Sequence, residues 1–100
     1  MTEILSARGL SKSFGPIVAL NRAIALGEAE GPAAGLAALA AIDGARLGRY
    51  PFLPAARGEL LLRVGRSEEA ALALREALAA ARSPAEARFF ERRLATVARM

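Results

Sequence analysis

The residue types that most often carry catalysis are missing from this sequence. Its 100 residues include no histidine and no cysteine. The usual general base, the commonest metal ligand and any thiolate site are therefore absent. The closest carboxylate groupings are Glu28 with Glu30 and Glu68 with Glu69. We expect both to lie at helix ends, where the helix dipole and water account for them. The sequence therefore predicts a protein that is not an enzyme and that binds no metal or cofactor.

Arginine is the residue that most plainly suggests a binding function. Thirteen of the fourteen basic residues are arginine, and the formal net charge is +4. Such a balance permits contact with nucleic acid or with an acidic protein surface, and does not choose between them. Arg88, Arg92 and Arg99 fall on one side of an expected C-terminal helix, near Arg93. We interpret this row as the solvated outer face of a capping helix; the alternative is a surface for an acidic partner or nucleic acid. Sequence-specific readout is not expected, because lysine is nearly absent and stacking aromatics are missing unless Phe89 is exposed.

A change of composition near residue 16 divides the chain. Residues 1–15 contain two glycines and three serines without a helical period, and predict an extended or disordered arm. From Pro16 onward the pattern is helical, so residues 16–100 are expected to form one all-α domain. Ser67 and Ser83 are expected to cap helices, the second within the capping box Ser83-Pro84-Ala85-Glu86. Prolines and glycines divide the domain into five expected helices. These cover residues 17–30, 32–43, 51–64 (or from 54), 68–82 and 84–98, with a loop over 44–54.

A possible repeat organises these helices. Gly31 and Gly65 lie 34 residues apart, and each separates two helices. Thirty-four residues is the tetratricopeptide period. In the second pair, Gly58 is expected where the two helices approach closely, with Ala70 and Ala77 facing the partner helix; the first pair matches only in outline. The sequence therefore predicts an antiparallel, tetratricopeptide-like array of about five helices, with the last helix as a cap.

Further candidate contact residues lie on the other helices. Asn21 and Arg22 form the only polar pair in an apolar run, 17–27. In the structural interpretation Asn21 satisfies a backbone group and Arg22 reaches water or pairs with an acid such as Glu59; the alternative is a partner contact on the concave face. Leu72 lies off the core stripe and would form a contact patch with Leu60–Leu62. The candidate partner-binding residues are Asn21, Arg22, Arg57, Leu72, Arg88, Arg92 and Arg93.

Several stretches within residues 16–98 keep the order found in one known group of proteins. They are VALNRAIA at 18–25, GPAA at 31–34, Tyr50 with PAAR at 54–57, LLRVGR at 61–66 and FFERRL at 89–94. Together they resemble the tetratricopeptide-like C-terminal extension of extracytoplasmic-function RNA polymerase sigma factors. The resemblance implies a regulatory protein-contact role, with RNA polymerase or sigma-factor domains as partners. Because the chain has no room for the two sigma domains that contact promoter and polymerase, we do not expect it to direct transcription alone.

A second resemblance covers residues 3–20. The stretch ILSARGLSKSFG at 4–15, continuing into VAL at 18–20, is similar to the first strands of an ATP-binding-cassette ATPase. Phe14 matches the aromatic that stacks on adenine in that family. No glycine-rich phosphate loop ending in Lys-Ser/Thr follows, so ATP hydrolysis is not expected. The overlap of the two resemblances at residues 16–20 suggests a fused gene or an atypical start.

These observations favour a non-catalytic protein–protein interaction module. The alternatives are a basic nucleic-acid-binding helical module and a folded remnant of a fused gene without a function of its own. The apolar ends of a two-repeat array make a homodimer a further option. No signal peptide and no apolar stretch of membrane-spanning length is visible, so a soluble cytoplasmic protein is expected.

Overall fold

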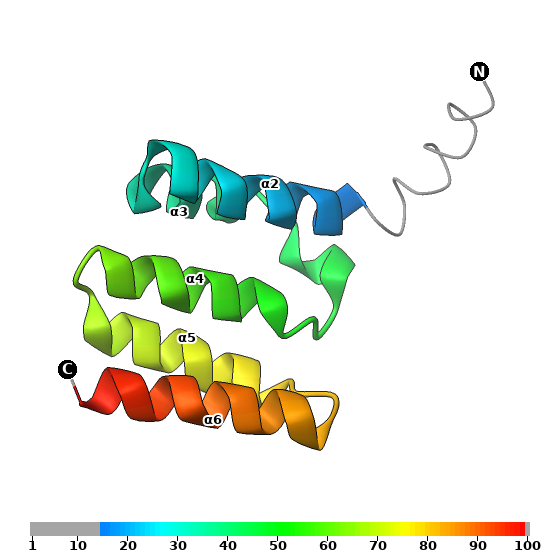
Figure 1. Ribbon diagram of the computed structural model, residues 1–100. Coiled ribbons are helices and arrows are strands. Elements are labelled where there is room, and N and C mark those ends of the chain that lie inside the picture. Colours follow the sequence, from blue (N-terminus) through cyan, green and yellow to red (C-terminus); the bar gives the residue numbers. More distant parts are fainter. Residues whose placement is uncertain (1–14, 100) are drawn as a thin grey trace.

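The fold is an array of α-helices. In the computed structural model of the protein, residues 15–99 are described, apart from the side chains of residues 45 and 46. Within this range there are five α-helices, one short 3-10 helix and no β-strand, which confirms the predicted all-α array. Residues 1–14 of the expected N-terminal arm lie outside the described residues. The helices are α2 (Gly15–Glu30), α3 (Pro32–Ala40), α4 (Phe52–Arg63), α5 (Ser67–Ala79) and α6 (Pro84–Ala98), with the 3-10 helix η1 (Gly44–Leu47) before α4 (Figure 1).

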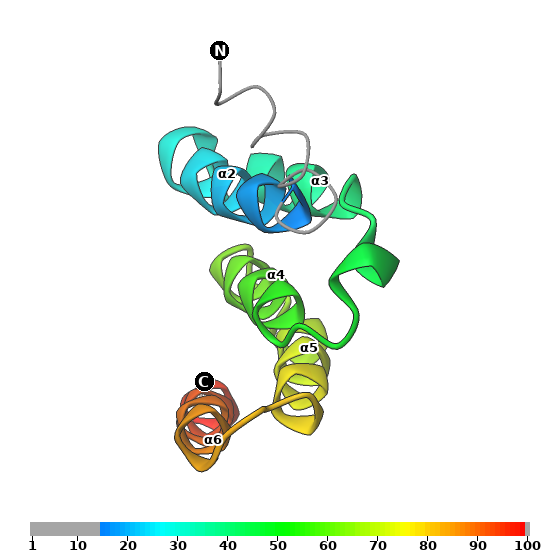
Figure 2. The ribbon, with the colours of Figure 1, turned by 90° about the vertical axis from the view of Figure 1, so that its right-hand side faces the viewer.

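The helices form two layers. Helices α2, α4 and α6 lie side by side and run in the same direction, and α3 and α5 return behind them (Figures 1 and 2). Each helix is therefore antiparallel to the next one along the chain, as short connections require. The layer of three parallel helices therefore presents one broad side.

Local chemistry sets most of the helix ends. Gly31 and Gly65 have φ angles of 108° and 85°, a region that only glycine enters without strain, so both turns fall where predicted. The Ser83 hydroxyl accepts a hydrogen bond from the Glu86 amide at 3.1 Å, which confirms Ser83 as the cap of α6. The predicted cap at Ser67 is wrong. Helix α5 begins at Ser67 itself, and its side chain makes no capping bond; the preceding residue, Arg66, takes the cap position.

The expected ends of α3 and α5 lie too far along the chain. Helix α3 ends at Ala40 and α5 at Ala79. At the end of α5, the Arg49 guanidinium donates a hydrogen bond to the Ala79 carbonyl at 2.7 Å. This bond satisfies one of the free carbonyl groups of the last turn and places a cation at the negative end of the helix dipole. The loop before α4 also contains η1, which the sequence analysis did not predict.

The core runs through the array as three linked clusters. The first joins α2 and α3 to α4 through Leu20, Leu39 and Leu60, and the second joins α4 and α5 to α6 around Phe90. Phe90 and Leu74 are fully buried. No polar or charged side chain is buried in residues 15–99, so apolar contact between neighbouring helices stabilises the array.

Glycines allow the paired helices to approach closely. A Cβ atom added at Gly35 would lie 2.9 Å from the Gly27 Cα and 3.1 Å from the Ala23 carbonyl oxygen. At Gly58 it would lie 3.2 Å from the Ala70 carbonyl oxygen, as the predicted close approach requires. The first pair therefore has its own close contact, at Gly27 and Gly35, which alanine-rich surroundings hid from the sequence analysis. The tetratricopeptide assignment of the two helix pairs stays a prediction.

Candidate partner-contact surface

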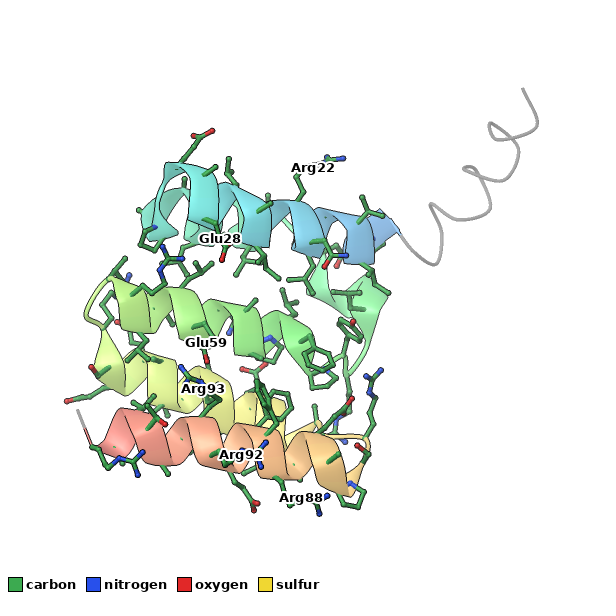
Figure 3. All side chains as sticks on the ribbon, in the orientation of Figure 1. Arg22, Glu28, Glu59, Arg88, Arg92 and Arg93 are labelled. Carbon is green, nitrogen blue, oxygen red and sulfur yellow. The ribbon has the colours of Figure 1, made fainter. Side chains whose placement is uncertain are left out.

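The exposed side of α2, α4 and α6 contains a hollow between two of its helices. Glu28 and Glu59 lie on this side, with Arg93 reaching up from α6 (Figure 3). The hollow has a volume of about 330 Å³. Its walls combine apolar and charged side chains: Ile24, Glu28, Ala56, Glu59, Leu60 and Arg63. We name this side the α2–α4–α6 face and include Phe89 and Arg93 of α6 in it.

A bidentate ion pair joins α4 to α6 on this face. Arg93 donates to the two Glu59 carboxylate oxygens at 2.6 and 2.7 Å. The hydrogen bonding that Arg93 donates to the Glu59 carboxylate is the main cause that raises the pKa of Arg93 above its ordinary value. The predicted pairing of Glu59 with Arg22 is therefore wrong, because α4 packs with this carboxylate toward α6. Arg93, predicted as a partner-binding residue, is half-buried and already bound within the chain.

Phe89 is an exposed ring on a buried support. Its side chain is 44% exposed, and its ring meets Phe90 edge-on, with centroids 5.4 Å apart. Phe90 packs on Phe52 at 5.8 Å, and Phe52 packs on Tyr50 at 5.5 Å. This chain of rings holds Phe89 in place while leaving much of it open to solvent. The exposure of Phe89 could not be predicted from the sequence, since the side of α6 that meets α5 depends on tertiary packing.

Three arginines form a row on α6. Arg88, Arg92 and Arg99 are exposed, and none of them has an ion-pair partner among residues 15–99. They lie opposite Phe90 and Val97, the buried side of the helix; Figure 3 shows Arg88 pointing away from the array. The helix dipole accounts for Arg99 at the C-terminal end. The exposure of Arg88 and Arg92 agrees with the interpretation of this row as the solvated outer face of α6 and leaves both side chains open to a partner.

Arg82 lies in the connection between α5 and α6. Its guanidinium pairs with Glu86 at 2.7 Å and lies over the rings of Tyr50 and Phe52, 5.2 and 5.7 Å from their centroids. The hydrogen bond between the two side chains raises the pKa of Arg82 and lowers that of Glu86. Glu86 also accepts from the Arg82 amide at 2.8 Å. The capping carboxylate thus reaches one residue further back than a standard capping box.

Asn21 and Arg22 are exposed and face different ways. Asn21 shares one side of α2 with Ile24 and Glu28, at spacings of three and seven residues, and so borders the α2–α4–α6 face. Arg22 instead lines a second hollow, between α2 and α3, and points away from the array (Figure 3). Arg22 reaches water, which the structural interpretation of this pair allowed, whereas the expected hydrogen bond from Asn21 to a backbone group is not found among residues 15–99.

Leu72 and Arg57 do not join this surface. Leu72 is 63% exposed on α5, in the rear layer. The predicted patch with Leu60–Leu62 is wrong, since Leu60 and Leu61 turn into the core. Arg57 approaches Glu76 of α5 at 3.7 Å and lines a separate hollow beside the loop before α4. The structure thus divides the predicted contact residues among several separate surfaces and does not bring them together.

Residues 15–99 contain no group of three or more acidic side chains placed to hold a metal ion. No helix in the same range has the length and hydropathy needed to cross a membrane.

Comparison with known proteins gives one relative. No family model matches the chain, and no solved structure matches it. An uncharacterized protein of Rhizobium meliloti (strain 1021) is 40% identical over 79 residues. The match covers 79% of this chain and 18% of that protein. A similar sequence therefore occurs as one part of a much longer chain.

Proposed function

We propose that this chain is a non-catalytic protein–protein interaction module that binds a partner through the α2–α4–α6 face. One observation carries the proposal. Two large apolar side chains, Ile24 and Phe89, are 39% and 44% exposed on this face, on either side of α4. Exposed aromatic and aliphatic residues gathered on one side of a fold are typical of contact sites. The hollow beside Ile24 provides a place for a partner side chain.

We further propose that the array is of the tetratricopeptide-like kind that extends certain RNA polymerase sigma factors. The order of the resembling stretches supports this, as do the paired helices with glycines at their close approaches. The longer relative supports an array that works as a segment of a larger protein. RNA polymerase or sigma-factor domains are then the partners, and the cytoplasm is the place of action.

A direct binding experiment tests this partner. The full chain, immobilised on a sensor, is exposed to purified bacterial RNA polymerase core enzyme and, separately, to isolated sigma-factor domains. We expect measurable binding to one of them, weakened about tenfold or more by Ile24→Glu, because a buried contact would then carry an unpaired charge. The matched control is Leu72→Glu, which changes an exposed apolar residue of the rear layer and should leave binding unchanged. Absence of binding to both probes would exclude the sigma-related partner.

A second candidate function is nucleic-acid binding. The observation that favours it is the exposed ring of Phe89 beside the arginines of α6, since an aromatic with basic neighbours suits single strands. Affinity for single-stranded DNA or RNA should then fall steeply as salt rises from about 50 to 200 mM. No measurable affinity at low salt would remove this candidate.

A further inference from the structure

We infer that the partner segment bound at α6 is an acidic stretch of protein. It places an apolar side chain against Phe89 and carboxylates on Arg88 and Arg92. This inference rests on the proposed function and names the chemistry of the partner where the α2–α4–α6 face, at Phe89, meets the outer side of α6. It follows from three features of the described fold: the unmatched charge on α6, the spacing of its arginines and the fixed position of the Phe89 ring.

On α6, Arg88 and Arg92 have no ion-pair partner among residues 15–99. The other basic groups that touch this helix have acids of their own, since Arg93 is held by Glu59 and Arg82 by Glu86. The remaining acid of the helix is Glu91, which is exposed. The outer side of α6 therefore has an excess of positive charge that complements an acidic surface.

The spacing of the two arginines suits carboxylates on a helix or an extended segment. Arg88 and Arg92 are one turn apart, which places them about 6 Å from each other along the axis. Guanidinium groups bind carboxylates in a bidentate, planar arrangement. Phe89 stands between them in sequence and next to them on the helix surface, so one segment can contact all three side chains.

The ring of Phe89 is positioned before any partner arrives. Its edge-on contact with Phe90, which is fully buried, restrains it. A restrained side chain loses little conformational entropy on binding. Aromatic residues and arginine are enriched where binding energy concentrates, and α6 displays both within one turn.

A foreign protein fits this site better than nucleic acid or a second copy of the chain. Exposed Glu91 lies three residues from Arg88 and would repel a continuous phosphate backbone, whereas a protein can place a cation or a neutral group there. For a second copy, the exposed carboxylates of Glu28, Glu30 and Glu68 stand near helix ends, and that of Glu91 lies on α6 itself. They form no row that would match two arginines one turn apart.

Fluorescence anisotropy of labelled probes tests the inference on the full chain. The first probe is a helical peptide of about 16 residues built from Glu, Leu and Ala, with Glu one turn apart. The second probe is the same peptide with Gln for every Glu, and the third is a single-stranded DNA of equal charge. We expect the acidic peptide to bind more tightly than both other probes.

Matched variants separate local recognition from net charge. We expect Arg88→Gln with Arg92→Gln, and separately Phe89→Ala, to weaken binding of the acidic peptide about tenfold. The control double variant, Arg22→Gln with Arg75→Gln, removes the same charge from exposed sites on α2 and α5 and should change affinity less than about twofold. Circular dichroism of each variant checks that the helices are intact.

Four results would each overturn the inference. They are an equal loss of affinity in the control variant, no loss of affinity in either α6 variant, tighter binding of the DNA than of the acidic peptide, and no binding of the acidic peptide. A failure here differs from a failure of the proposed function. If the partner binds through Ile24 but ignores the α6 variants, only the acidic-segment inference is lost.

Discussion

Replacement of Gly35 by alanine is the sharpest test of how the first helix pair packs. In the folded chain a Cβ atom at this position would lie 2.9 Å from the Gly27 Cα, 3.1 Å from the Ala23 carbonyl oxygen and 3.0 Å from a Leu60 methyl carbon. Two of these three neighbours are backbone atoms, which cannot turn aside as a side chain can. The substitution therefore forces α2 and α3 apart.

The expected size of the effect follows from two opposing terms. Overpacking of a tight contact costs about 1–3 kcal/mol, and the backbone contacts place Gly35→Ala at about 2–3 kcal/mol of that range. Replacement of glycine by alanine within a helix stabilises the helix by about 1 kcal/mol. The net loss in free energy of unfolding is about 1–2 kcal/mol, which lowers the Tm of a domain this size by about 4–16 °C.

Two further glycines complete the series. At Gly27 the nearest atom to an added Cβ is a Leu60 methyl carbon at 2.9 Å, the end of a flexible side chain. Gly27→Ala should therefore cost less than Gly35→Ala. At Gly15 nothing lies within 4 Å, so Gly15→Ala should be neutral or slightly stabilising. Thermal unfolding followed by circular dichroism measures all three. A Gly35→Ala protein as stable as Gly15→Ala would refute the close approach of α2 and α3.

The remaining predictions concern caps and ion pairs. Ser83→Ala should lower the free energy of unfolding by about 1 kcal/mol through loss of the α6 cap. Ser67→Ala, where no capping bond exists, should change it by less than about 0.5 kcal/mol; equal effects in urea unfolding would contradict this assignment. In a double-mutant cycle, Glu59→Gln and Arg93→Gln should show a coupling of about 0.5–1 kcal/mol that shrinks in high salt; a coupling of zero would mean that the pair does not stabilise the fold. The lowered pKa of Glu86 means that its pairing stabilises the fold above its ordinary pKa of 4.5, and this contribution is lost as pH falls through the lower folded pKa. Tm curves of wild type and Glu86→Gln should therefore converge in acid, and a constant gap down to about pH 2 would contradict the pairing.

Features set by neighbours in sequence were predictable. The turns at Gly31 and Gly65 followed from the conformational freedom of glycine, and the cap at Ser83 followed from the residues beside it. Ser67 shows the limit of such reasoning. Serine is a preferred cap residue, but α5 begins at Ser67 itself and not after it. The preceding residue, Arg66, is bonded to Glu69 at 2.6 Å.

Features set by packing between distant helices were not predictable in the same way. The partner of Glu59 depends on how α6 stacks on α4, so Arg93 could not be chosen over Arg22 from spacing alone. The inward turn of Leu60 and the outward position of Phe89 have the same origin. A long run of alanines also gives no contrast between buried and exposed positions, which explains why the contact of Gly27 with Gly35 was missed.

Photo-crosslinking in the source cell tests the central claim most directly, that a partner protein binds the α2–α4–α6 face. Benzoylphenylalanine replaces Ile24, Phe89 or Leu72, one at a time, in the full-length protein, and adducts are identified by mass spectrometry. We predict that positions 24 and 89 capture the same protein and that position 72 on the rear layer does not. Adducts at position 72 alone, or no adduct at either 24 or 89, would contradict the account.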